Sequence, residues 1–244
     1  MNTIIIILGV VLILVIVYMI FQDYFTGKTK MTKQIHLANE NPGDFAGKDL
    51  SIPNASNVTY SVWIYVASWS TGQEKIIFSR DNDVHLHFDS NSATLKATIH
   101  GIKETSGEAI TFTKGNGPEA QTIDITNNFP VQKWVCVLIS IDNIIADIYL
   151  DGKLVKSVQF SDPSSPGAPQ TIATTDADAI TFGNWDCYIS KFERNPRVTD
   201  PKTAYDKYME GNGGSNLGNA LGNFNVKFAI TKDNVETSKF LLLG

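Results

Sequence analysis

The sequence between residues 134 and 160 reads WVCVLISIDNIIADIYLDGKLVKSVQF, three strand-like runs separated by two tight turns. Trp134–Ile141 and Ile144–Leu150 are rich in β-branched residues and are joined by Asp142 and Asn143. The pair Asp-Gly at positions 151 and 152 then leads into a third run that ends at residue 160, and Asp-Gly is a strong signal for a type I′ turn. The stretch therefore predicts an antiparallel meander.

The same kind of pattern continues on both sides of the meander. Alternating or β-branched runs, bounded by turn residues, predict further strands at Thr59–Val66, Val84–Phe88, Leu95–His100, Ala179–Gly183 and Cys187–Phe192. One helix is expected after them, at Lys202–Glu210, with Asp200 as its cap, Pro201 at its first position and Gly211 at its end. Many short strands with so little helix predict an all-β fold, an antiparallel sandwich or barrel.

A long apolar run precedes this part of the chain. Ile4–Phe21 contains 18 residues and no charge, with Leu12 near its centre. As a helix it would be about 27 Å long, close to the thickness of the hydrocarbon layer. A signal peptide would need a basic start, a shorter run and small residues at a cleavage site, and these are missing. The run predicts an uncleaved, single-pass transmembrane anchor.

The flanks of the run predict an orientation. Lys28, Lys30 and Lys33 follow the run closely, and no basic side chain precedes it. By the positive-inside rule, the rest of the chain should lie on the cytosolic side, with these lysines near anionic headgroups. Asn54 and Asn57 begin two glycosylation tripeptides that would be modified in a lumen, but such tripeptides also arise by chance.

We expect four segments along the chain. Residues 1–25 form the anchor, and residues 26–56, which are polar and punctuated by Pro and Gly, form a juxtamembrane stalk. Residues 57–211 form the sandwich. Residues 212–244 begin with a spacer rich in Gly and Asn and end in a strand or arm, in which Phe224 and Phe228 are candidate partner contacts.

Composition and cysteine usage exclude some classes of protein. The net charge of −5 argues against a nucleic-acid-binding protein, which normally has a basic face. Cys136 and Cys187 both lie in apolar strand-like runs, so buried free thiols are expected, although one disulfide between neighbouring strands stays open. Two separated cysteines also exclude a cysteine-based metal site.

Two groups of residues are candidate metal ligands. Asp81, Asn82 and Asp83 offer oxygen atoms for calcium, although Asp and Asn also favour turns without any metal. His85 and His87 share one face of a predicted strand and are candidate transition-metal ligands together with Asp83 or Asp89. The alternative is an ordinary polar strand face. No zinc-finger spacing, P-loop or nucleophile elbow occurs.

Four tryptophans have different expected roles. Trp63 and Trp134 lie inside predicted strands, and we expect both in the core. Trp69 and Trp185 lie near strand ends beside small polar residues. They are candidates for stacking on a sugar or contacting a protein partner, with packing at the core or its rim as the alternative.

Several motifs occur in a familiar order, and they are Tyr60–Val66, Lys75–Arg80, Trp134–Ile141, Ile148–Val155, Phe182–Asn184, Tyr188–Phe192 and Tyr205–Gly211. Together they resemble the concanavalin A-like lectin/glucanase domains of the laminin-G/pentraxin type. The resemblance implies a jelly-roll β-sandwich. An N-terminal anchor before such a domain resembles membrane-associated proteins of large DNA viruses with internal membranes.

The resemblance also frames the functional hypotheses. Its glucanase branch uses a Glu-x-Asp-x-x-Glu strand, and no Glu here has that spacing, so an enzyme is not expected. The first hypothesis is a non-enzymatic structural protein, a minor capsid or membrane-tethering component of a virion that contacts lipid and other capsid or membrane proteins. The alternative is a membrane-displayed lectin that binds glycans, and a degenerate hydrolase is a third option. No cofactor is expected apart from the candidate calcium.

Overall fold

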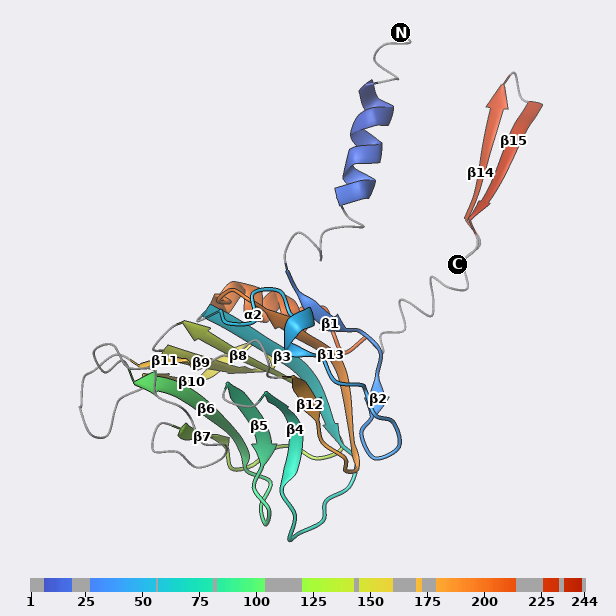
Figure 1. The fold of residues 1–244 in the computed structure, drawn as a ribbon. Helices are drawn as coiled ribbons and strands as arrows, with labels where there is room; N and C mark the ends of the chain where they lie inside the picture. The colour runs from blue at the N-terminus through green and yellow to red at the C-terminus, as the bar shows by residue number, and fades with distance from the viewer. Residues whose placement is uncertain are drawn as a thin grey trace.

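The computed structural model describes residues 7–18, 27–55, 57–80, 83–103, 120–142, 145–159, 170–172, 179–213, 226–232 and 235–242. Within these residues, two antiparallel sheets pack face to face (Figure 1). Each sheet has one apolar face that must be buried, and packing the two faces together buries both. The predicted antiparallel β-sandwich is confirmed.

The first sheet contains the predicted meander. Its strands run in the order β1 (Thr29–Met31), β13 (Cys187–Asn195), β3 (Asn57–Val66), β8 (Trp134–Asp142), β9 (Ile145–Leu150) and β10 (Lys153–Gln159), with β2 (Ile35–His36) also paired to β13. β8 pairs with β9, and β9 pairs with β10, as expected. Asp151 and Gly152 have φ angles of 48° and 73°, which is the backbone that a type I′ turn requires.

The second sheet is built from the middle of the chain. Its strands run in the order β11 (Gln170–Ile172), β6 (Leu95–Lys103), β5 (Val84–Phe88), β4 (Lys75–Arg80) and β12 (Ile180–Phe182), and β7 (Ala120–Thr126) also pairs with β6. The alternation in β5 follows the sequence pattern, because Val84, Leu86 and Phe88 are fully buried while His85 and His87 are half-buried. One face of this sheet is therefore apolar and the other polar.

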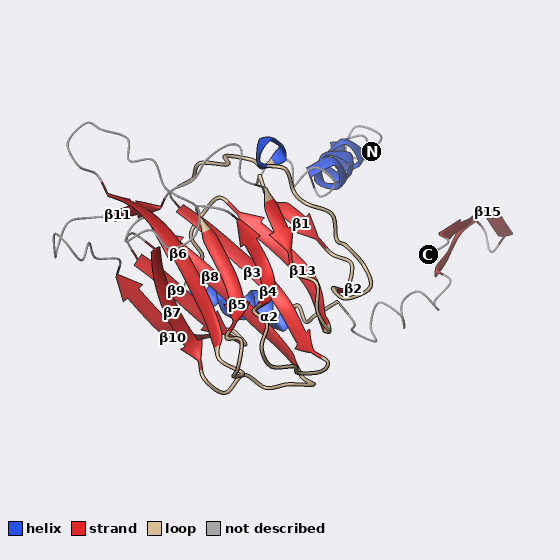
Figure 2. Cartoon of the chain, turned by 60° about the horizontal axis from the view of Figure 1, so that its bottom comes forward, coloured by secondary structure: helices blue, strands red, loops and turns tan. Residues whose placement is uncertain are grey.

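A helix covers part of the outer face of the first sheet. α2 (Pro201–Met209) begins as predicted, because the Asp200 carboxylate accepts a hydrogen bond of 3.0 Å from the Thr203 backbone amide. Ala204 of α2 packs against Leu138 and Tyr149 in a small cluster separate from the main core. Figure 2 shows α2 behind the strands, on the side of the first sheet away from the second sheet.

Parts of the segment expected to form a stalk pair with strands of the sandwich. Within residues 26–56, β1 and β2 both pair with β13, and Phe45 forms a bridge to Ile180 of β12. Leu37 and Leu50 are buried in the main core, and a short 3₁₀ helix, η1 (Gly47–Asp49), precedes Leu50. Strands of two or three residues are too short to show a period, so their pairing is invisible in the sequence.

Trp63 and Trp134, both expected in the core, lie on the outer face of the first sheet. Trp63 pairs with Cys136 across β3 and β8, and Tyr65 pairs with Trp134, so all four side chains are on the outer face of the first sheet. Trp63 is buried there, whereas Trp134 is half-buried with its ring 5.5 Å from that of Tyr65. Trp63 is therefore buried as predicted, although between the first sheet and α2, whereas the core position predicted for Trp134 is wrong.

The predicted anchor is described only in part. Residues 7–18 form a helix in which every residue is exposed, Leu12 included, except the half-buried Gly9. Ile4 and Phe21, the ends of the expected span, lie outside the described residues. No helix within the described residues is long and apolar enough to cross a membrane. The transmembrane anchor stays a prediction.

The C-terminal region contains a separate hairpin. β14 (Val226–Lys232) and β15 (Val235–Leu242) pair with each other and, among the described strands, with neither sheet of the sandwich (Figure 1). Phe228 is opposite Phe240 in the backbone register. Phe224 lies outside the described residues, so its predicted partner contact is untested.

Candidate ligand-binding site

An irregularity in β13 places charged residues on the outer face of the first sheet. The pairing of β13 with β3 shifts between Ser190 and Glu193, and Lys191 has a φ of 48°. Such a bulge adds one residue to a strand and redirects the side chains around it. As a result, Phe192 is fully buried in the core while Lys191 and Glu193 both line a cavity on the opposite face.

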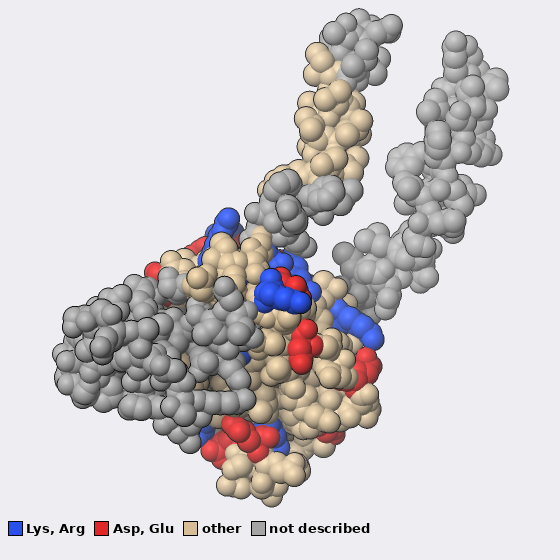
Figure 3. All heavy atoms as spheres, in the orientation of Figure 1, with Lys and Arg blue, Asp and Glu red and all other residues tan. Residues whose placement is uncertain are grey.

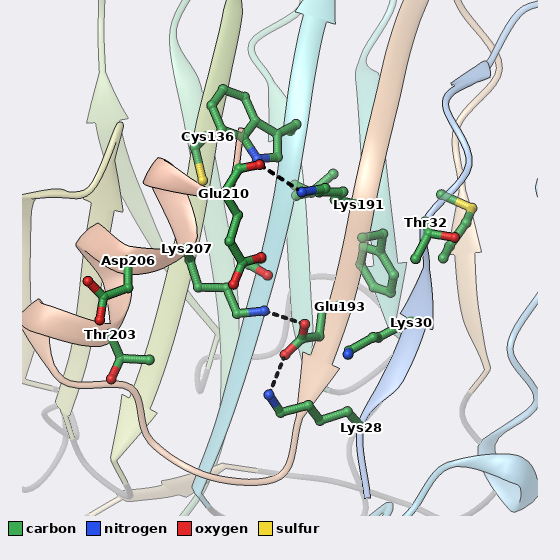
Figure 4. Close-up of a pocket in the computed structure, with 15 residues that line it drawn as sticks. Lys28, Lys30, Thr32, Cys136, Lys191, Glu193, Thr203, Asp206, Lys207 and Glu210 are labelled. Carbon is green, nitrogen blue, oxygen red and sulfur yellow. Dashed lines mark hydrogen bonds and ion pairs between the residues drawn. The ribbon is translucent and has the colours of Figure 1, made fainter. Parts of the chain in front are cut away.

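The cavity lies between α2, β1 and the outer face of β3 and β13 (Figure 4). Its volume is about 270 Å³. The lining residues are Lys28, Lys30, Met31, Thr32, Ser61, Val62, Trp63, Cys136, Lys191, Phe192, Glu193, Thr203, Asp206, Lys207 and Glu210. An apolar floor with charged groups around it is the usual composition of a small-molecule site.

Ion pairs hold the three walls of the cavity together. The Glu193 carboxylate, which is 6% exposed as a residue, contacts the Lys28 ammonium at 3.4 Å on one side. On the other side it accepts a hydrogen bond from Lys207 of α2 (Figure 4). The Lys191 ammonium donates to the backbone carbonyl of Glu210 at 3.0 Å. Four lysines and three carboxylates line the cavity, so its formal charge is positive by one, and two of the lysines share the Glu193 carboxylate.

The floor of the cavity is aromatic. The Trp63 ring is stacked on the Tyr208 ring of α2, with centroids 5.8 Å apart and planes 20° apart. Cys136 lies beside it, and burial raises the pKa of the Cys136 thiol to about 12. The thiol is therefore protonated at neutral pH and is not an activated nucleophile. Cys187, in the main core, is also a free buried cysteine, as expected.

The three lysines predicted to lie near headgroups have other contacts here. Lys28 and Lys30 line the cavity, and Lys28 is paired with Glu193. Lys33 is exposed and forms an ion pair of 3.0 Å with Glu40. The sequence missed the cavity because Glu193, Lys191 and Lys207 are distant from these lysines along the chain.

Trp69 and Trp185 meet at the rim of the main core. Their ring centroids are 6.5 Å apart, and both rings contact the buried Phe88 edge-on. The Trp185 indole donates to the Ile76 carbonyl at 2.7 Å, and the Lys75 ammonium lies 4.5 Å from the centre of the Trp69 ring. The packing interpretation accounts for both tryptophans, and a glycan or partner contact at this rim is untested.

Asp83, a candidate calcium ligand, is buried in the core and hydrogen-bonded there. Its carboxylate accepts hydrogen bonds from the Tyr60 hydroxyl at 2.6 Å and from the Arg80 guanidinium at 2.9 Å, and all three residues are fully buried. Desolvation raises the pKa of the Tyr60 hydroxyl, which therefore stays protonated. Asp83 is thus unsuited to a surface calcium site, while Asp81 and Asn82 lie outside the described residues.

The two strand histidines lie together as predicted, but with a different acid. His85 and His87 share the outer face of β5, and the carboxylate near them is Glu74. Asp83 is in the core, and Asp89 forms an ion pair of 3.0 Å with Lys96. The expected third ligand, Asp83 or Asp89, is therefore wrong.

A protein-family model places this fold among known domains. The model of the concanavalin A-like lectin/glucanases superfamily matches residues 43–192, which is more than half of the chain. The chain belongs to this superfamily. The superfamily match begins inside the segment that the sequence alone assigns to a stalk, and it includes Phe45, which forms a bridge to Ile180.

Solved structures similar to this superfamily member include binding domains of botulinum neurotoxins. The binding domain of neurotoxin DC, solved with rat synaptotagmin II, is 17% identical with a TM-score of 0.43, and the match covers 75% of this chain and 46% of that one. The serotype D domain solved with N-acetylneuraminic acid is 15% identical with a TM-score of 0.45, covering 76% and 42%. The chain thus spans about half the length of these domains, and no curated protein matches it.

Proposed function

We propose that the protein is a non-enzymatic, lectin-like binding protein, held at a membrane by residues 4–21, whose cavity beside α2 takes the acidic group of a glycan. The observation that supports this most is the surplus of lysine around an apolar floor. Lys28, Lys30, Lys191 and Lys207 line the cavity together with the Trp63 ring. Ammonium groups form strong, charge-assisted hydrogen bonds with carboxylate or sulfate oxygens.

The carboxylates of the cavity favour binding over glycoside hydrolysis. Hydrolysis needs a protonated acid on one side of the glycosidic bond and a free carboxylate on the other. Three carboxylates line the cavity, and two of them already have lysine partners, Glu193 with Lys28 and Lys207 and Asp206 with Lys202. Glu210 is the third, and a single carboxylate cannot fill both roles.

The proposed display on a membrane has two supports. The helix of residues 7–18 exposes apolar side chains, which a bilayer would cover. Asn54 and Asn57, the acceptor residues of the two glycosylation tripeptides, are both exposed. For a glycan-binding protein the domain should lie on the extracellular or luminal side, opposite to the side that the lysines after the anchor predict.

Binding of acidic oligosaccharides tests the cavity directly. A sulfated or sialylated oligosaccharide is expected to bind the full chain, and Lys191→Gln should weaken binding by about tenfold or more, the loss typical of a hydrogen bond to a charged group. Glu193→Gln should strengthen it, because Lys28 and Lys207 lose their shared carboxylate. Lys48→Gln, at an exposed position outside the cavity, is the matched control. Equal affinities in all three variants would contradict the proposal.

A structural tether is the second candidate, and the C-terminal hairpin favours it. An isolated two-stranded hairpin is only marginally stable in water, and its free edge can pair with a strand of another protein. β14 and β15 form such a hairpin, separate from both sheets among the described strands. In this proposal the anchor holds a membrane and the hairpin holds a neighbouring protein, such as the capsid shell of a membrane-containing virion. Failure of every glycan to bind, charged or neutral, would favour it.

A further inference from the structure

Two imidazole rings lie side by side on the polar face of the second sheet. In β5 the buried residues Leu86 and Phe88 alternate with His85 and His87, whose ring centroids are 4.6 Å apart. Both histidines are half-buried. The spacing of two residues in a strand directs both side chains to the same face, so this proximity is fixed by the backbone.

A carboxylate from the loop before β4 completes the group. One oxygen of Glu74 lies 2.9 Å from Nδ1 of His87 and 4.0 Å from Nε2 of His85. One donor atom from each of the three residues lies within 4.8 Å of the others. Two imidazole nitrogens and one carboxylate oxygen are thus gathered around one point.

We propose that Glu74, His85 and His87 bind a divalent first-row transition-metal ion, with zinc as the best match. Zinc takes nitrogen and oxygen ligands at about 2.0–2.2 Å, which puts tetrahedral ligand atoms about 3.3–3.5 Å apart. The two distances to Glu74, 2.9 and 4.0 Å, bracket that separation. Three protein ligands leave the fourth position for water or for an atom of a bound molecule.

The surroundings of His87 suit a metal ligand. Nε2 of His87 lies 3.2 Å from the Thr98 hydroxyl, which in turn lies 2.9 Å from the Thr122 hydroxyl. Such a contact on the second nitrogen orients the ring and leaves Nδ1 to face the metal.

The neighbouring charges do not prevent cation binding. Lys96, opposite His87 in the register of β5 and β6, has its ammonium 3.0 Å from the Asp89 carboxylate and 3.7 Å from that of Asp124. Two carboxylates neutralise this lysine.

Cobalt and zinc titrations of the full chain in detergent test the site. One equivalent of Co²⁺ should give the intense visible absorption of four-coordinate cobalt, and Zn²⁺ should displace it. Glu74→Gln should weaken Zn²⁺ binding at least tenfold by calorimetry, and His87→Gln should abolish the cobalt spectrum. His36→Gln is the control, since His36 pairs with Asp186 elsewhere and should not contribute.

The same variants show which results would contradict the proposed metal site. Glu74 is half-exposed, so its replacement should leave the fold intact even if His87→Gln does not fold. Zinc affinity that is unchanged in Glu74→Gln and in His85→Gln, or that is lost in His36→Gln, would overturn the proposal. Because Glu74 does not line the cavity beside α2, acidic glycan binding should be the same in Glu74→Gln, which separates this inference from the proposed function.

Discussion

Asp83→Ala should lower the free energy of unfolding by about 3–5 kcal/mol, the loss typical when one partner of a buried ion pair is removed. Arg80 and Asp83 are both fully buried and joined at 2.9 Å. Removal of the carboxylate leaves the Arg80 guanidinium in the core without that partner, and the Tyr60 hydroxyl loses its acceptor. Urea unfolding followed by tryptophan fluorescence measures the change.

Two further variants show whether the buried charge is the cause. Asp44→Ala removes an exposed carboxylate and should change the stability by no more than about 0.5 kcal/mol. The double variant Arg80→Met/Asp83→Leu should recover most of the loss, because replacing both charges with apolar groups leaves no uncompensated ion. A single variant as stable as the wild type would place Asp83 outside the core.

The second large effect concerns the apolar N-terminus. Deletion of residues 1–26 should release the protein from membranes completely, and the full chain should stay in the pellet after extraction with alkaline carbonate. Leu12→Arg places a charge at the centre of the predicted span and should cost on the order of 2.5–3.5 kcal/mol of insertion free energy.

The matched control for this prediction is Leu12→Ile, which keeps the residue apolar and should insert as the wild type does. Fractionation and immunoblotting of the four proteins are sufficient as measurements. Full release of the wild-type chain by carbonate would show that residues 4–21 do not span a bilayer.

Local signals predicted the elements of this fold well. The type I′ turn at Asp151 and Gly152, the strands around it, and the capped helix after Asp200 all depend on residues close together in the sequence. The short strands β1 and β2 were missed because they are held by β13, more than 150 residues away. A strand of two or three residues shows no hydrophobic periodicity, and a partner so far along the chain cannot be identified from the local sequence.

The candidate site was predicted poorly, for a related reason. Strict alternation along β13 would place Lys191 and Glu193 on the core side with Ile189, which is unfavourable for two charged residues. The placement of two charged residues at core-facing positions could have been used to predict the bulge from the sequence. The partners of Glu193, by contrast, come from the segment before β1 and from α2, and only the fold brings them together.

Two of the three proposed metal ligands on the outer face of the second sheet could be predicted from the sequence. The spacing of His85 and His87 already placed both rings on one face. Glu74 lies in the loop immediately before β4, and no sequence pattern there predicts the direction in which its side chain points. On the face drawn in Figure 3, acidic and basic residues are interspersed.

The most direct test of the proposed binding site uses the indole resonances of the four tryptophans in the ¹⁵N-labelled chain. Trp63 lines the cavity, whereas Trp69 and Trp185 pack at the far rim and Trp134 lies on β8 beside Tyr65. Titration with a sulfated tetrasaccharide should shift the Trp63 resonance selectively, and the desulfated sugar should not. Shifts confined to Trp69 and Trp185, or no shift at all, would contradict the cavity as the binding site.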